Sequence, residues 1–295
     1  MPDTGDPPRA LPANWPNAEY SSFVTAAGMR WHVQRAGVGP TVVLVHGTAG
    51  ATFSWSEIFP RLMAHADVIA FDLPGHGFTT GASTDQLSLT GMSNAVAALL
   101  RALNVQPEIG VGHSAGAAVL LQLAASNEVT PQSIIGVNSA LVSINALGQF
   151  LLPFSRTLFD VEPVRATVAA LLRGGTLARA LLRSTGTALD PIQEARYVSM
   201  LTDETRVGAV LQMMARWDLP PLLSMFPHIP LPVTLVHSRN EPWVPVGELM
   251  EATRTLPMRS VIDVTPAGHL IPDEKPREVA DIIAAACASL ASRTS

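Results

Sequence analysis

Strand-like and helix-like stretches alternate along most of this 295-residue chain, and this alternation limits the possible folds more than any other feature. The strand-like runs are apolar and rich in β-branched residues, which is typical of strands buried on both faces. They cover residues 29–34, 41–46, 68–72, 108–113, 133–138, 233–237 and 260–264. Helix-like stretches cover residues 89–103 and 115–125, a region near 245–256, and the chain from about 276. Such alternation predicts a parallel sheet with crossover helices on both faces.

The alternation stops between residues 140 and 226, where helical pieces are broken by prolines and glycines. This block lies between two strands, so it emerges at the carboxyl edge of the sheet, where open α/β folds bind ligands. We therefore expect a tail at 1–20, an α/β core formed by 21–139 and 227–295, and a helical cap at 140–226 that covers the site.

Composition and charge argue against several functional classes. The net charge is -5 and no run of Lys or Arg stands out, so no nucleic-acid partner is expected. No apolar run reaches the ~18 residues of a bilayer span, and the start lacks a signal-peptide pattern, so we expect no transmembrane segment and a cytoplasmic location. The single cysteine, Cys287, is expected in the core of the last helix. Metal-ligand spacings and phosphate-binding glycine loops are absent from the sequence, which predicts neither a metal nor a cofactor.

A G-x-S-x-G motif, Gly112-His113-Ser114-Ala115-Gly116, stands between a strand-like run and a helix-like stretch. In that context the serine lies on a sharp, strained turn, and its hydroxyl projects above the carboxyl edge of the sheet. Glycines flank the serine because residues close to such a turn must be small. A serine hydroxyl is a weak nucleophile at neutral pH and needs a base. The motif therefore predicts Ser114 as a nucleophile.

His269 is the predicted base, because it follows the last strand-like run and fits the chain order of serine, acid and histidine. The acid holds the tautomer of the imidazole and stabilises its charged form. It is expected after the strand-like run 233–237, where Glu241 is the only carboxylate of the following loop. Asp263 and Asp218 are the alternatives.

Two backbone N–H groups are expected to bind the oxyanion of such a reaction. Ala115, the residue after the nucleophile, supplies one, and Thr48, in the loop after the strand-like run 41–46, supplies the other. His46 is expected to brace that loop by hydrogen bonding, although a packing role fits equally well. The remaining histidines without such a context are His32, His65 and His228, expected at the surface or an interface, and His237, expected in the core.

Motifs spread over residues 14–275 carry a resemblance to known proteins. The G-x-S-x-G at 112–116 and Asp-Leu-Pro-Gly-His-Gly at 72–77 are widely shared, whereas the segments at 185–191 and 213–219 are more discriminating because they fall in the variable insertion. By these motifs the chain resembles the α/β-hydrolase superfamily and, more narrowly, the BchO-type magnesium-chelatase accessory proteins of bacteriochlorophyll synthesis. The resemblance implies an α/β-hydrolase fold, with an eight-stranded, mostly parallel sheet and a helical cap insertion.

The expected function is that of a cofactor-free serine hydrolase acting on an ester-like bond of an apolar substrate. Four apolar side chains of the insertion are expected to line the substrate pocket. They are Phe150, Met213, Met214 and Trp217. The family commonly has an aspartate where Glu241 stands, so the identity of the acid stays open.

The resemblance also implies a pathway, the biosynthesis of bacteriochlorophyll, with a tetrapyrrole ester as substrate and magnesium chelatase as a partner. Two other functions stay open. One is a non-catalytic accessory protein that binds a porphyrin or the chelatase, and the other is a cofactor-free haloperoxidase or perhydrolase. Epoxide hydrolase and dehalogenase chemistry are disfavoured, because those enzymes use an aspartate at the position of Ser114.

Overall fold

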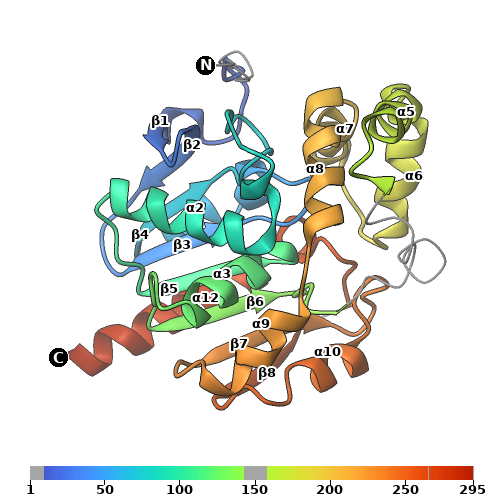
Figure 1. Ribbon diagram of the computed structural model, residues 1–295. Helices are drawn as coiled ribbons and strands as arrows, with labels where there is room; N and C mark the ends of the chain where they lie inside the picture. Colours follow the sequence, from blue (N-terminus) through green and yellow to red (C-terminus); the bar gives the residue numbers. More distant parts are fainter. Residues whose placement is uncertain (1–9, 143–157, 265, 295) are drawn as a thin grey trace.

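The computed structural model describes residues 10–142, 158–264 and 266–294, and within them eight strands form one sheet (Figure 1). The strands are β1 (Ser21–Ala26), β2 (Met29–Ala36), β3 (Thr41–Val45), β4 (Asp67–Phe71), β5 (Ile109–His113), β6 (Ser133–Val137), β7 (Val233–Ser238) and β8 (Arg259–Val264). Their order is β1-β2-β4-β3-β5-β6-β7-β8. The β1–β2 and β2–β4 pairs are antiparallel and the others are parallel, so the predicted mostly parallel sheet is confirmed.

Helices cover both faces of this sheet (Figure 1). They are α1 (Phe59–Leu62), α2 (Leu89–Ala102), α3 (Ala115–Ala125), α9 (Pro220–Met225), α10 (Val246–Ala252), α11 (Ile271–Glu274) and α12 (Pro276–Thr294). Successive residues of β3 serve opposite faces, because side chains alternate along a strand. Val43 and Val45 pack in the cluster that contains α2 and α3, whereas Val42 and Leu44 pack with α1 and α12. Cys287 is buried in this second core, as predicted.

In the described part of the chain between β6 and β7, four further helices stand together at one end of the sheet (Figure 1). They are α5 (Glu162–Arg173), α6 (Thr176–Ser184), α7 (Pro191–Leu201) and α8 (Glu204–Arg216). Their apolar side chains share a third cluster with Phe53, Phe78 and Leu270, which belong to loops at the carboxyl ends of sheet strands. The helices of the insertion are therefore attached to the carboxyl edge of the sheet.

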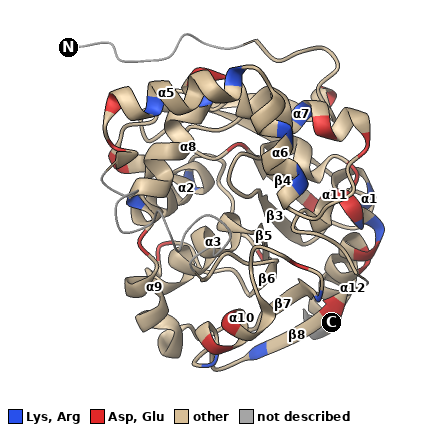
Figure 2. Cartoon of the chain, turned by 90° about the vertical axis from the view of Figure 1, so that its right-hand side faces the viewer, with Lys and Arg blue, Asp and Glu red and all other residues tan. Residues whose placement is uncertain are grey.

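Charged residues of both signs lie along α5 and α7, and α6 carries arginines (Figure 2). Some of them link the helices of the insertion: Arg173 of α5 pairs with Glu204 of α8, and Arg179 of α6 pairs with Glu194 of α7. These pairs are exposed, so each contributes little to stability. The shared apolar cluster is the main contribution that holds the insertion together.

The chain before β2 contains a strand that the sequence did not predict. β1 forms a hairpin with β2 at the edge of the sheet, and its side chains are mostly half-buried or exposed, which leaves no clear apolar pattern. Trp15 is also buried, and its Nε1–H donates to Thr52 Oγ1 at 3.0 Å. Part of residues 10–20 thus packs on the core.

The expectation that His32 lies at the surface or an interface is wrong. Its ring is fully buried in β2, and Nδ1 lies 2.8 Å from Asp72 Oδ2. The Asp72 carboxylate also accepts the backbone N–H groups of Thr52 and Phe78, each at 2.7 Å. Burial disfavours its charged form, but His32 and the other donors outweigh burial and hold the pKa of Asp72 below its ordinary value. His65 and His228 are exposed, as expected.

Replacing Asp72 with alanine is expected to lower the free energy of unfolding by about 3–5 kcal/mol, because it leaves buried donors without an acceptor. Because its folded pKa is lowered, the carboxylate stabilises the fold above its unfolded pKa of about 3.9, and this contribution is lost as the pH falls through the folded value. Urea denaturation at neutral and acid pH measures both effects. Asp67→Ala is the control, since its partner Arg35 is 43% exposed and the pair is worth about 0–1 kcal/mol. Equal losses in both variants would contradict the account.

Candidate active site

Ser114 lies at the turn between β5 and α3, in a strained backbone conformation with φ 51° and ψ −116°. The turn leaves no room for a side chain two residues before the serine or two residues after it. A Cβ on Gly112 would lie 2.4 Å from the backbone nitrogen of Ala117, and a Cβ on Gly116 would lie 2.2 Å from the carbonyl oxygen of Val45. The glycines of the motif therefore allow the close approach that presents Ser114 at the carboxyl edge.

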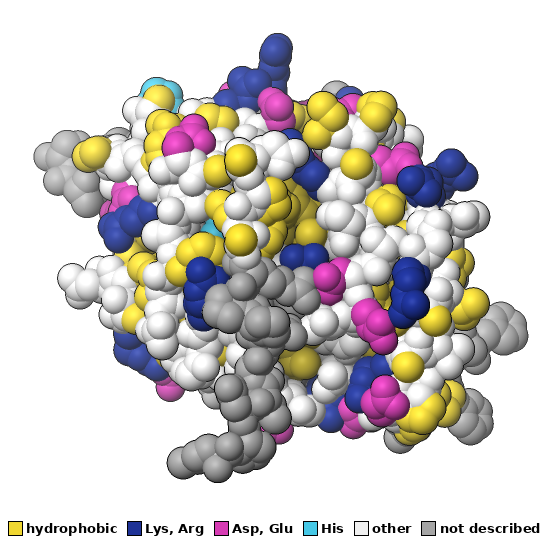
Figure 3. Space-filling view, turned by 90° about the horizontal axis from the view of Figure 1, so that it is seen from above, with side chains coloured by type: hydrophobic (Ala, Val, Ile, Leu, Met, Phe, Trp, Pro, Cys, Tyr) yellow, Lys and Arg dark blue, Asp and Glu magenta, His cyan; other side chains and the backbone are white. Residues whose placement is uncertain are grey.

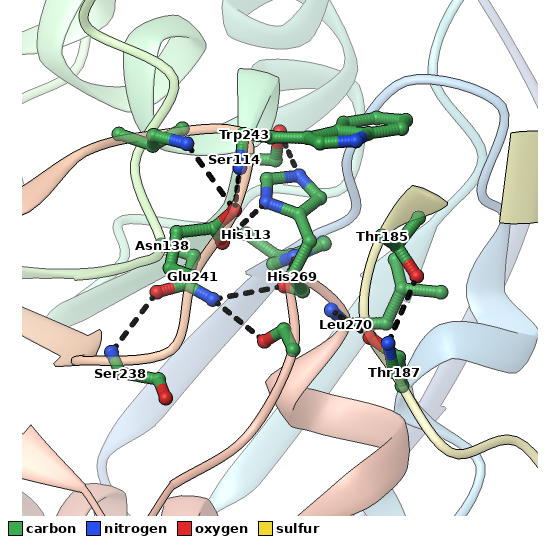
Figure 4. A network of polar contacts seen from close by, with 12 residues as sticks. His113, Ser114, Asn138, Thr185, Thr187, Ser238, Glu241, Trp243, His269 and Leu270 are labelled. Carbon is green, nitrogen blue, oxygen red and sulfur yellow. Dashed lines mark hydrogen bonds and ion pairs between the residues drawn. The ribbon is translucent and has the colours of Figure 1, made fainter. Parts of the chain in front are cut away.

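The structure brings the three predicted catalytic side chains together (Figure 4). His269 Nε2 lies 3.0 Å from Ser114 Oγ, and His269 Nδ1 lies 2.6 Å from Glu241 Oε2. All three residues are buried. An Nδ1–H that donates to the carboxylate leaves the Nε2 lone pair free to accept the serine O–H. This is the arrangement in which a histidine can take a proton from a serine.

Glu241 is held by its own loop as well as by His269. Its Oε1 accepts the backbone N–H groups of Trp243, at 2.5 Å, and Val244, at 3.2 Å. The alternatives lie elsewhere: Asp263 pairs with Arg239 at 2.7 Å on the surface, and Asp218 is exposed. Among these carboxylates, Glu241 is the one hydrogen-bonded to His269.

Two residues that the sequence did not indicate bind the main chain of the loop that carries His269. This loop, residues 266–270 before α11, is called the base loop below. Asn138, directly after β6, donates from Nδ2 to the carbonyl oxygens of Gly268 and His269 at 3.1 and 3.0 Å. His113 Nε2–H donates to the same His269 oxygen at 2.9 Å (Figure 4). Asn138 follows a strand at the carboxyl edge and has a positive φ of 40°, a conformation that favours asparagine. That position was the available signal in the sequence.

The loop after β3 lies against the nucleophile. A Cβ on Gly47 would lie 2.9 Å from Ser114 Cβ, and the Gly50 N–H donates to the Gly47 carbonyl at 3.0 Å, which closes a turn around Thr48. Opposite it, Ala115 opens helix α3, where a backbone N–H has no acceptor within the helix. The predicted oxyanion donors, Thr48 and Ala115, thus belong to segments that flank Ser114.

His46 braces the loop after β3 by hydrogen bonding, as expected. Its Nδ1–H donates to the Gly47 carbonyl at 2.8 Å, and its Nε2 accepts the Leu73 N–H at 2.9 Å. Burial lowers the pKa of His46, and it lowers the pKa of His113 to about 3, so both rings are neutral at physiological pH. His237 is buried in β7, as expected, and burial lowers its pKa too. The ring of Trp243 lies over His269, with centroids 5.0 Å apart.

The residues predicted to line the substrate pocket have different surroundings. Met213 of α8 is 2% exposed and belongs to the core cluster that contains α3, and Trp217 packs against that cluster half-buried. Met214 is 43% exposed. Phe150 lies outside the described residues. A separate cleft of about 330 Å³ lies between residues 75–87 and α8. The face seen from above is hollowed near its middle, with apolar side chains in the hollow (Figure 3).

The described residues contain neither a metal-site arrangement nor a membrane-spanning helix. In the described ranges, no group of three or more His, Cys, Asp and Glu side chains has the arrangement of a metal site. No helix in the same part of the chain is long and apolar enough to cross a bilayer.

Comparison with known proteins identifies the family. A sequence model of the alpha/beta hydrolase family matches residues 42–282. The chain is 33% identical over 268 residues to the magnesium-chelatase 30 kDa subunit of Rhodobacter capsulatus, covering 90% of this chain and 93% of that protein. It is also 33% identical over 111 residues to 2-hydroxy-6-oxo-2,4-heptadienoate hydrolase of Pseudomonas putida, covering 37% of this chain and 40% of the relative.

A solved structure agrees with the fold. The crystal structure of an alpha/beta hydrolase fold protein from Burkholderia ambifaria superposes with a TM-score of 0.76 at 21% identity, covering 90% of this chain and 97% of that one. At that identity the likeness concerns the fold alone. The resemblance to magnesium-chelatase-associated proteins that the sequence suggested is confirmed by the Rhodobacter relative. The chain belongs to the alpha/beta hydrolase family.

Proposed function

We propose that this protein is a serine hydrolase that cleaves an ester-like bond of an apolar substrate. The observation that carries the proposal is the continuous chain of contacts from Glu241 through His269 to Ser114, at 2.6 and 3.0 Å. Membership of a hydrolase family supports it, although family alone does not fix the reaction.

The proposed reaction begins when Ser114 Oγ attacks the carbonyl carbon of the ester while His269 Nε2 takes the hydroxyl proton. A bond forms between Oγ and carbon, and the carbonyl electron pair moves to oxygen. Glu241 stabilises the positive imidazole through its 2.6 Å contact with Nδ1. The oxyanion then re-forms the carbonyl, the bond between that carbon and the leaving oxygen breaks, and the proton passes from His269 to the leaving oxygen, while the acyl group stays on the serine.

The negative oxygen formed in this step needs donors that are already in place. We assign that role to the backbone N–H groups of Ala115 and Thr48, because the segments that carry them flank the nucleophile. Water then attacks the acyl carbon while His269 takes a proton from it, the bond from that carbon to Ser114 Oγ breaks, and the proton returns to Oγ as the acid is released. No bound cofactor is needed for any of these steps.

The substrate class follows from the insertion and from the Rhodobacter relative. We propose that the described helices between residues 140 and 226 form a cap over Ser114, and that Met213, Met214 and Trp217 line its apolar inner side. The name of that relative, a magnesium-chelatase subunit, supports a substrate from magnesium-porphyrin biosynthesis, such as a tetrapyrrole ester. A tail at residues 1–20 of which part packs on the core, an α/β core of 21–139 and 227–295, and a cytoplasmic location belong to the same proposal.

The Met213→Gln variant is expected to lower kcat/KM for a long-chain ester about tenfold, with a change of no more than about twofold for an acetate ester. A polar group in an apolar wall weakens the binding of the chain but leaves the reacting centre untouched. Leu171→Gln is the control, because Leu171 lies on α5 and is 62% exposed. Because Met213 is buried in the core cluster, the Met213→Gln variant is also expected to unfold more easily, so both rates are corrected for the unfolded fraction. Equal corrected effects on both esters would contradict a substrate contact by Met213.

A second candidate function is supported by the same relative. A non-catalytic protein that binds a porphyrin or magnesium chelatase would also resemble a chelatase subunit over 90% of its length. In that case Ser114 and its buried contacts would form a site that is not used for catalysis.

Turnover and binding of porphyrin-type esters separate the two functions. We expect wild-type protein to hydrolyse such an ester and Ser114→Ala to bind it without hydrolysis. Binding with equal affinity by both proteins, and no hydrolysis of porphyrin or simple apolar esters by either, would favour the accessory function.

A further inference from the structure

A short segment of the insertion, residues 185–187, touches the base loop directly (Figure 4). The backbone N–H of His269 donates to the Thr185 carbonyl at 2.8 Å. The next N–H, that of Leu270, donates to Thr187 Oγ1 at 2.9 Å. Two successive amides of the base loop thus find their acceptors in the insertion and not in the α/β core.

Close packing accompanies these hydrogen bonds. A Cβ on Gly268 would lie 2.3 Å from the backbone nitrogen of Thr187. Gly186 has a positive φ of 68°, and a Cβ there would lie 3.4 Å from Pro242, the residue after Glu241. The segment therefore contacts both the loop of the predicted base and the loop of the predicted acid.

Helix α7 fixes the other end of the base loop. Tyr197 O–H donates to Asp273 Oδ2 at 2.7 Å, and Gln193 Nε2–H donates to the Asp273 carbonyl at 3.0 Å. Asp273 lies in α11, four residues after His269, and burial raises the pKa of its carboxyl to about 7. The insertion thus holds the chain at His269 itself and again just beyond it.

We propose that residues 185–187 are a positioning element for His269, with Thr187 as the side chain that sets the base loop in place. The core binds the carbonyl side of this loop through Asn138 and His113, and the insertion binds its amide side. The imidazole is then correctly placed only when the insertion is seated on the core. This inference rests on the proposed hydrolase function and assigns a catalytic consequence to a segment that does not touch the reacting atoms.

The test compares Thr187→Val, which removes the acceptor with little change of shape, with Thr187→Ser, which keeps it. We expect Thr187→Val to lower kcat for an apolar p-nitrophenyl ester about 10- to 100-fold with KM nearly unchanged, because small misplacement of a catalytic group has effects of this size. Thr187→Ser is expected to restore most of the rate. Thr167→Val is the matched control, since the Thr167 hydroxyl on α5 donates to Pro163 on the surface.

The rate at which a fluorophosphonate modifies Ser114 is the second readout, because it reports the serine–histidine pair without substrate binding. The inference predicts a slower reaction in Thr187→Val and an unchanged one in Thr167→Val. Equal rates in wild type and Thr187→Val would overturn it. So would a loss that matches only the unfolded fraction of Thr187→Val. A wild type that does not react at all would overturn the proposed hydrolase function itself, which is a different failure.

Discussion

Ser114→Ala is expected to lower kcat/KM for an apolar ester about 10⁵- to 10⁶-fold, the size of effect seen when a serine nucleophile is removed. The variant has no hydroxyl to attack the carbonyl, so His269 has no proton to accept. The substitution is small and at a position that is 4% exposed, and we expect the unfolding midpoint to stay close to that of wild type. Steady-state hydrolysis of a p-nitrophenyl ester measures the effect.

Ser126→Ala provides the control for this variant. Ser126 lies just beyond the far end of α3, and its hydroxyl donates to the Leu123 carbonyl at 2.9 Å, away from the site. Its activity is expected to stay within about twofold of wild type, since such surface changes are nearly neutral. A Ser114→Ala protein that keeps a substantial part of the wild-type rate would contradict the assigned nucleophile.

His269→Ala is expected to lose more activity than Glu241→Ala, by about one to two orders of magnitude. The base transfers the proton in both halves of the reaction, whereas the carboxylate orients the imidazole and stabilises its charge. The structure supports this difference, because Glu241 contacts Nδ1 and lies on the side of the ring away from Ser114. Kinetics of both single variants with the same ester make the comparison.

Asp263→Ala and Asp218→Ala are the matched controls for the acid. Asp263 pairs with the exposed Arg239, so its loss is expected to leave the rate nearly unchanged. If Glu241→Ala kept its turnover and either aspartate variant abolished it, the assignment of the acid would be wrong.

Local sequence signals predicted the sheet because its central strands are short apolar runs rich in β-branched residues. Runs of this kind are typical of strands that are buried on both faces. The predicted helix at 115–125 corresponds to α3. A Cβ on either glycine of the motif would lie within 2.5 Å of a backbone atom, which is why no other residue fits there. The edge strand β1 was missed because its half-exposed side chains carry no such pattern.

Polar contacts between residues far apart in the sequence could not be predicted, for a different reason. Nothing near His32 in the sequence indicates its partner Asp72, 40 residues away, so the sequence predicts a surface or interface position for it. Thr187 and Leu270 are 83 residues apart, and their contact depends on how the insertion is seated. Asn138 acts on a loop 131 residues further along the chain. Such contacts depend on the tertiary fold, so they cannot be predicted from the local sequence pattern.

The central claim, an activated serine in this fold, is tested most directly by fluorophosphonate labelling followed by intact-mass analysis. We predict one adduct per folded chain, located at Ser114 by peptide mapping, with none on Ser114→Ala and a much slower reaction in His269→Ala. The absence of an adduct on folded wild-type protein at any excess of reagent would contradict the claim.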